Sequence, residues 1–339
     1  MANAETVLEM KNLHTYFFTS EGEIPAVEGV SLQINKGEVV GIVGESGSGK
    51  SVTSLSIMQL IPNPPGKIVD GEILFKGEDL LKANNKRMKQ IRGNEIAMIF
   101  QEPMTSLNPL FTIGNQLMEA IKIHQKISKK EARHKSIELL KSVGLPRAEE
   151  VMNEYPHQLS GGMRQRVMIA MAMSCDPEIL IADEPTTALD VTIQAQILDL
   201  MKKLNKEQNT AILFITHDLG VVAEMCDRVI VMYAGQVVEK GTVREVLKDP
   251  KHPYTKGLIR SLPKIDENTQ KLYSIAGTVP RPKKGRVGCR FAPRCEFAFD
   301  RCLEKNPELF ELENERLSRC FLYDEKEEVQ KGGKTSIRS

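Results

Sequence analysis

The segment GESGSGKS, Gly44 to Ser51, matches the pattern G-x-x-x-x-G-K-[ST]. It follows the apolar run EVVGIVG, which is typical of a buried strand, and it precedes KSVTSLSIMQLI, whose apolar residues have helical spacing. A strand, a glycine-rich turn and a helix in this order turn backbone N–H groups toward one centre, where the helix N-terminus adds partial positive charge. The stretch therefore predicts a cradle for a nucleoside triphosphate, formed by Gly44, Glu45, Ser46, Gly47, Ser48, Gly49, Lys50, Ser51 and Val52.

The end of this motif and a later strand together predict a Mg²⁺-dependent phosphate site. Lys50 is expected to reach the β- and γ-phosphates, and Ser51 is expected to ligate Mg²⁺. The stretch ILIADEP ends an apolar run in two carboxylates, of which Asp183 is expected to hold Mg²⁺ through its water shell. Because side chains alternate along a strand, Glu184 is expected to point elsewhere, where it can orient and deprotonate an attacking water.

Two further polar residues follow apolar strand segments. His217 lies in ITHD, and its expected role is to position the γ-phosphate and the attacking water. Gln101 follows AMIF, and its amide can meet Mg²⁺ or the water and can shift when the adjoining helical region moves. A lone histidine after a strand is usually only a polar strand end, so the prediction for His217 depends on its spacing after Asp183 and Glu184.

Apolar runs at 179–182, 211–215 and 229–233 have the same strand character as the run before the glycine-rich turn. They alternate with helical segments, which predicts an α/β fold with a parallel sheet and helices packed on it. The helical, methionine-rich stretch at 103–177 predicts a helical subdomain inserted between two parts of the sheet. After about Pro250, prolines, arginines and cysteines become frequent, which indicates a domain boundary. The expected domains are therefore an ATP-binding domain at 1–250, an extension at 251–325 and a disordered tail at 326–339.

The stretch LSGGMRQR predicts a second anion-binding turn outside the glycine-rich motif. Ser160 would cap a helix, and Gly161 and Gly162 leave backbone N–H groups free for an anion. An ordinary helix cap with a flexible entry is the alternative. Because the chain already has a complete phosphate cradle, a second one makes sense if it serves another subunit.

Four of the six cysteines fall in the last fifth of the chain, with the spacing C-x5-C-x6-C-x17-C. In a reducing cytosol, clustered thiols are more often metal ligands than disulfides. The spacing matches neither zinc fingers nor ferredoxins, and it leaves iron–sulfur, zinc and free or disulfide-forming thiols open. Arg290, Arg294 and Arg301 are interleaved where they could offset the charge of a four-thiolate site. Cys175 and Cys226 are expected to be buried thiols.

Charge and hydropathy argue against several classes of function. The 339 residues include 46 Lys and Arg against 45 Asp and Glu, a net charge of +1, so no positive field indicates a nucleic acid partner. No window approaches the ~20 consecutive apolar residues that span a bilayer, so a membrane role needs a partner chain. The N-terminus lacks the basic start and apolar run of a signal peptide, and the protein is expected to stay in the cytoplasm.

Five elements stand in order along the chain: GESGSGKS, Gln101, LSGGM, ILIADEP with TTALD after it, and His217. Together they resemble the nucleotide-binding subunit of an ABC transporter, over about residues 6–245. The resemblance implies a P-loop NTPase fold with a RecA-like parallel core, an antiparallel β subdomain and a helical subdomain. In one departure, Met163 stands where the family usually has glutamine; activity is expected to survive, because the contacts there come from the Ser160 hydroxyl and the glycine backbone.

The resemblance also implies a head-to-tail dimer that binds ATP and Mg²⁺ between two subunits. ATP would lie between the phosphate loop of one subunit and residues 160–162 of the other, with Asp190 at the dimer seam. Phe17 matches the aromatic residue that stacks on adenine in the family, and Tyr16 is the alternative. The catalytic residues for ATP hydrolysis would be Glu184, His217, Lys50 and Gln101.

The stretches KHPYTKGLIRSLP and GCRFAPRC resemble the C-terminal extension of dipeptide and oligopeptide importer ATPases. This implies ATP-driven peptide import at the cytoplasmic face of the membrane. The implied partners are two transmembrane permease subunits, a second ATP-binding subunit, related or identical, and, indirectly, an extracellular peptide-binding protein. A soluble ABC ATPase that acts on ribosomes or DNA is the rival function. The extension also implies a [4Fe–4S] cluster, with zinc as the alternative, held by Cys289, Cys295, Cys302 and Cys320.

Overall fold

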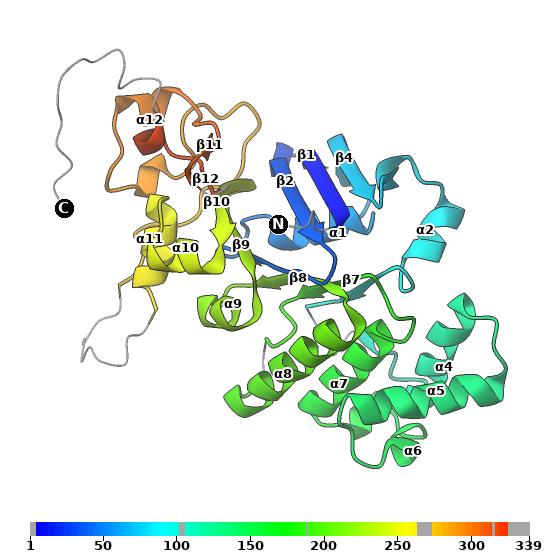
Figure 1. The fold of residues 1–339 in the computed structure, drawn as a ribbon. Coiled ribbons are helices and arrows are strands. Elements are labelled where there is room, and N and C mark those ends of the chain that lie inside the picture. Colours follow the sequence, from blue (N-terminus) through cyan, green and yellow to red (C-terminus); the bar gives the residue numbers. More distant parts are fainter. Residues whose placement is uncertain (1–4, 102–105, 188, 263–272, 314–315, 325–339) are drawn as a thin grey trace.

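The computed structural model describes residues 5–101, 106–187, 189–262, 273–313 and 316–324, which contain two β-sheets and the helices around them (Figure 1). The smaller sheet is antiparallel and has the strand order β2-β1-β4-β5. It is the expected antiparallel β subdomain, and its strands are β1 (Thr6–Thr19), β2 (Gly22–Asn35), β4 (Gly66–Phe75) and β5 (Glu78–Asp79).

The larger sheet has eight strands in the order β11-β12-β10-β9-β3-β8-β7-β6. Its centre is parallel, as the sequence predicts, and consists of β9 (Arg228–Tyr233), β3 (Val39–Val43), β8 (Ala211–Thr216), β7 (Ile179–Asp183) and β6 (Ile96–Ile99). Every residue of β3, β7 and β8 is buried. Burial on both faces explains why these strands are continuous apolar runs rather than alternating ones.

The carboxyl ends of the parallel strands meet at one edge of this sheet. β3 leads into the glycine-rich turn and then α1 (Lys50–Ile57), β6 leads to Gln101, and β8 leads to His217. Helix α1 ends four residues earlier than KSVTSLSIMQLI predicts, because Met58 caps it and Gln59 has a left-handed backbone with φ of 48°.

The region between β6 and β7 is helical, and in Figure 1 it lies on the far side of the large sheet from β1 and β2. Its apolar side chains form one buried cluster with α8 (Val191–Gln208) and with residues of β6, β7 and β8. Residues 102–105, at the start of the predicted subdomain, lie outside the described residues. The helices of this region are α4 (Ile113–His124), α5 (Lys129–Ser142), α6 (Ala148–Val151) and α7 (Gly161–Ala172).

The C-terminal extension is joined to the large sheet. The antiparallel strand β10 (Gln236–Thr242) pairs with β12 (Leu317–Ser318), which pairs with β11 (Phe310–Glu311). Aromatic rings make a second junction: Tyr233 of β9 lies 4.7 Å from Tyr254 and 5.2 Å from Phe291, between ring centroids. Tyr254 belongs to α11 (Pro253–Arg260). Other α-helices among the described residues are α2 (Asn85–Ile91), α9 (Leu219–Met225), α10 (Val243–Lys248) and α12 (Asp300–Glu304).

Glu239 is a buried acidic residue of β10 at this junction. Its carboxylate is fully buried and accepts hydrogen bonds from the backbone N–H groups of Lys251 and His252, both at 2.8 Å. Arg316, just before β12, donates to the same carboxylate through Nη2 at 2.7 Å. The extension therefore contributes the cation that balances a charge buried on β10.

We expect Glu239→Ala to destabilise the protein by about 3–5 kcal/mol, because it removes the buried carboxylate that Arg316 contacts and leaves this buried guanidinium only the exposed carboxylate of Asp249, at 3.6 Å. Urea unfolding of the full chain measures the difference. Glu150→Ala removes a carboxylate from the exposed pair with Arg147 and is the matched control, with an expected cost of about 0.5 kcal/mol or less. Equal midpoints for the two variants would contradict this account of the junction.

Candidate active site

The glycine-rich turn after β3 has a backbone that only glycine adopts easily. Gly44, Gly47 and Gly49 have φ of 155°, 79° and 100°. A Cβ at Gly44 would lie 2.2 Å from the carbonyl oxygen of Met232, and one at Gly49 would lie 2.5 Å from that of Ala26. The turn is thus pressed against the backbone of β9 and β2, which holds its shape before any ligand binds.

Lys50 folds back over this turn. Its Nζ donates to the carbonyl oxygens of Gly44 at 2.7 Å and Glu45 at 3.2 Å. Burial lowers the pKa of Lys50, although the carboxylates of Glu184, Asp183 and Glu45 oppose that shift. A buried ammonium group in a glycine-rich turn fits a polyphosphate, which can replace the two carbonyl contacts with stronger charge-assisted ones.

Ser51 and Asp183 meet where α1 begins and β7 ends. The Ser51 hydroxyl donates to Asp183 Oδ1 at 3.2 Å. Burial raises the pKa of Asp183, and the hydrogen bond from Ser51 opposes that rise. A hydroxyl and a buried carboxylate offer the oxygen ligands that Mg²⁺ prefers, so these residues fit the expected cation.

Glu184 lies at the centre of a polar cluster. Gln101 Nε2 donates to its Oε2 at 3.2 Å, the Thr187 hydroxyl donates to the same oxygen at 2.9 Å, and His217 Nδ1 lies 3.4 Å from its Oε1. The direction of the side chain has a different cause from the expected strand alternation. β7 ends at Asp183, and Glu184 already has a left-handed backbone with φ of 48°.

The glycine-rich turn and three residues of the Glu184 cluster face one cavity of about 720 Å³. Its described lining includes the glycine-rich turn, through Glu45, Ser46 and Lys50, and the cluster of Gln101, Glu184 and His217. Three residues of the extension, 277–279, also line it, and the sequence reasoning missed them because SIAGTVP indicates only an irregular, turn-rich segment.

One backbone donor of the predicted cradle points away from its centre. The N–H of Glu45 donates to the Tyr254 hydroxyl at 2.8 Å, so it is not directed at a phosphate. Burial and the neighbouring Glu45 carboxylate both raise the pKa of Tyr254, which keeps its hydroxyl neutral. The cradle therefore differs from the expected one at Glu45, whose N–H group binds the extension.

Other predicted residues lie outside this lining. Ser160 is exposed and caps α7, with the Met163 N–H donating to its hydroxyl at 3.3 Å, and Asp190 is exposed and caps α8. Tyr16 lies near Glu28 of β2 and Lys284 of the extension, and burial raises its pKa. Phe17 packs instead beside Gly66, where a Cβ would come 3.0 Å from its ring.

The four clustered cysteines line a second, small cavity in the extension. Cys289, Cys295, Cys302 and Cys320 face it together with apolar and aromatic side chains. Burial raises the pKa of each of three thiols, with that of Cys320 reaching about 12. Among the residues the structure describes, no group of three or more His, Cys, Asp or Glu side chains is arranged to hold a metal ion.

The three arginines between these cysteines have carboxylate partners. Arg290 contacts Glu28, and Arg301 contacts Asp324. Arg294 contacts Glu45 of the glycine-rich turn. These arginines were expected to offset thiolate charge, but each of them contacts a carboxylate. Through Glu28 and Glu45, Arg290 and Arg294 connect the extension to the ATP-binding domain.

Comparison with known proteins identifies both the domain that contains the glycine-rich turn and the C-terminal extension. The sequence profile described as ABC transporter matches residues 27–187, and the one described as oligopeptide/dipeptide transporter, C-terminal region, matches 238–302. The oligopeptide transport ATP-binding protein AppD of Bacillus subtilis is 59% identical over 320 residues, which cover 94% of this chain and 98% of AppD. The chain belongs to the ABC transporter family. It also resembles the oligopeptide transport ATP-binding protein OppD of the same organism, with 52% identity over 95% of this chain and 90% of OppD.

The solved structures support the same assignment for this ABC ATPase. The dimeric, post-hydrolysis ATP-binding cassette MJ0796, bound to ADP and Pi, superimposes with a TM-score of 0.63 and 33% identity, covering 70% of this chain and 99% of that one. As an ABC ATPase, the chain binds ATP and hydrolyses it to ADP and phosphate. None of the helices within the described ranges is long and apolar enough to cross a membrane.

We expect Thr187→Val to move the acid limb of ATP hydrolysis to higher pH. Burial alone would raise the pKa of Glu184, but the hydrogen bonds from Thr187 and His217 hold it below its usual value. Because the Thr187 hydrogen bond favours the ionised carboxylate, its loss raises the pKa of Glu184. The pH profile of single-turnover hydrolysis measures the shift, and Ser142→Ala, at an exposed hydroxyl on α5, should leave the profile unchanged. An unmoved acid limb in Thr187→Val would show that another group titrates there.

Proposed function

We propose that the chain is the ATP-hydrolysing subunit of a transporter that imports dipeptides or oligopeptides. The observation that supports this most is the polar cluster around Glu184, which faces the same cavity as Lys50 in a chain 59% identical to an oligopeptide transport ATP-binding protein. Binding of ATP closes two such subunits on each other, and hydrolysis lets them reopen. The chain then acts at the cytoplasmic face of the membrane without touching the peptide.

Each side chain of the cluster has a distinct role in the proposed reaction. Lys50 holds the β- and γ-phosphates and offsets their charge. Glu184 accepts a proton from water as the water oxygen bonds to the γ-phosphorus and the bond to the β–γ bridging oxygen breaks. His217 holds the γ-phosphate, and Gln101 orients the water. Ser51, Asp183 and Gln101 would hold Mg²⁺, which would supply positive charge next to the phosphates.

A second subunit completes the site in this proposal. Ser160 and Gly161 are exposed at the N-terminus of α7, where backbone N–H groups can receive the γ-phosphate of a partner. Asp190, also exposed, lies at the seam, and Phe17 stacks on adenine, with Tyr16 as the alternative. The dimeric form of MJ0796, which shares 33% identity with the chain, supports such an arrangement. The second subunit is this chain again or a related one.

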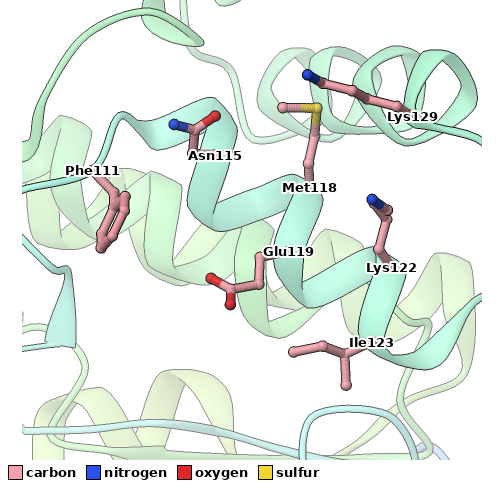
Figure 2. Close-up of a pocket in the computed structure, with 7 residues that line it drawn as sticks. All are labelled: Phe111, Asn115, Met118, Glu119, Lys122, Ile123 and Lys129. Carbon is pink, nitrogen blue, oxygen red and sulfur yellow. The ribbon is translucent and has the colours of Figure 1, made fainter.

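The permease contact is proposed at α4. Figure 2 draws the side chains that line a cavity of about 470 Å³ along this helix, with Lys129 of α5 at its side. Phe111 and Ile123 in this lining are 52% and 68% exposed, and nearby Leu110 is 80% exposed. Exposed apolar side chains of this size mark a protein interface, and a permease supplies the membrane-spanning part that this chain needs.

The rival function, a soluble ATPase that acts on ribosomes or DNA, has less support. The net charge of +1 gives no field that attracts nucleic acid, and the extension profile at 238–302 is that of peptide transporters.

We expect the full chain to co-purify from membranes with two permease subunits and to hydrolyse ATP faster when peptide and its binding protein are added. Ile123→Glu places a charge on the α4 face and should reduce this stimulation about tenfold, with nucleotide binding unchanged. Val69→Glu, on the small sheet, makes the same chemical change at an exposed valine and should keep the stimulation. Recovery with ribosomes and no response to peptide would reject the transport function.

We propose, in addition, that the cysteine cavity holds a [4Fe–4S] cluster, with zinc as the alternative. Four thiols around one apolar cavity are a soft donor set that suits either metal centre. The cluster would stabilise an extension that has few apolar residues.

We expect the full chain, purified without oxygen, to show broad visible absorbance that dithionite bleaches, together with bound iron and sulfide. Cys295→Ser should lose this absorbance and lower the melting temperature, because it removes one of the four ligands. Cys175→Ser changes a buried thiol outside the cavity and should keep the absorbance. Colourless protein that contains zinc would establish the alternative, and protein without metal would reject both.

A further inference from the structure

Arg294 of the extension forms an ion pair with Glu45 of the phosphate loop, although the two residues are 249 positions apart in the sequence. Its Nη1 and Nη2 donate to the two carboxylate oxygens of Glu45, at 2.7 and 3.0 Å. Two parallel hydrogen bonds are the strong, oriented form of an arginine–carboxylate pair. The Arg294 side chain is only 4% exposed, so solvent screens this pair little.

The other donors of Arg294 reach a second segment of the extension. Nε donates to the carbonyl oxygen of Ala276 at 2.9 Å, and Nη2 donates to that of Ile275 at 3.2 Å. Nη1 also donates to the Tyr233 hydroxyl at 3.4 Å. These contacts use all five N–H groups of the guanidinium. A lysine in this place has one charged centre and cannot reproduce them.

Arg294 holds one residue that lines the nucleotide cavity, Glu45, and a segment, 275–276, that directly precedes other lining residues. Glu45 and Ser46 line one side, and 277–279, directly after Ala276, line another. The Tyr254 hydroxyl holds the same loop by accepting the Glu45 N–H. The extension therefore contacts both the backbone and the side chain of Glu45.

We propose that Arg294 is a positioning residue for ATP: through Glu45 and residues 275–276 it sets the shape of the phosphate loop and of the facing wall before nucleotide binds. Arg294 does not line the cavity among the described residues, so it acts through Glu45. The effect falls on nucleotide affinity rather than on the chemical step. The inference depends on ATP binding alone and would stand if the transported substrate were not a peptide.

The test is ATP binding and hydrolysis by the full chain with Arg294→Gln. We expect the Kd for ATP and the KM to rise together by about tenfold to a hundredfold, as for loss of a buried charge-assisted pair. The kcat at saturating ATP should stay within about threefold of wild type. Arg294→Lys should recover only part of the affinity. Arg260→Gln removes an exposed pair with Glu296 in the same extension and is the matched control, with unchanged Kd.

Glu45→Gln removes the other member of the same ion pair. Because the Glu45 side chain is 31% exposed, this variant is expected to fold even if Arg294→Gln does not. It should raise the Kd as Arg294→Gln does, and the double variant should be no worse than the weaker-binding single one. Unchanged ATP affinity in Glu45→Gln would overturn the proposal. Additive losses in the double variant would also overturn it, because they would show that Arg294 acts by another route.

Discussion

Parallel pairing of β3, β8, β7 and β6 is the constraint on which the active site depends. Each of these strands ends at the same edge of the sheet, so four segments that are distant in the sequence deliver their polar residues to one place. Strands β3, β7 and β8 are buried, and apart from Asp183 and Thr216 at the carboxyl ends of β7 and β8 they contain no polar side chain. What they provide is a fixed edge at which the glycine-rich turn and the Glu184 cluster face one cavity, with Ser51 and Asp183 in contact at the same edge.

The C-terminal extension is part of this site. Its strands continue the large sheet, its buried Arg316 balances Glu239, and its residues 277–279 close one wall of the nucleotide cavity. Arg294 connects that wall to Glu45 in the phosphate loop. The segment that distinguishes this chain from a minimal ATP-binding cassette thus contacts the nucleotide machinery directly.

Much of the site could be predicted from the sequence because its signals are local. A glycine-rich turn between a strand and a helix, or carboxylates at a strand end, are patterns of adjacent residues. The direction of Glu184 was predicted for the wrong reason, since its left-handed backbone begins a turn where strand alternation no longer applies. The contacts of Glu45 with Arg294 and Tyr254 could not be predicted, because they join residues more than two hundred positions apart, and a sequence pattern does not show which charges meet after folding.

In the proposed reaction, Glu184 activates water for attack on ATP held by the phosphate loop. Its most direct test is ATP binding and single-turnover hydrolysis by Glu184→Gln in the assembled complex. We expect ATP affinity close to wild type with hydrolysis slowed about a hundredfold or more, because the amide keeps the shape of the side chain but cannot accept the proton. Hydrolysis at the wild-type rate would contradict it.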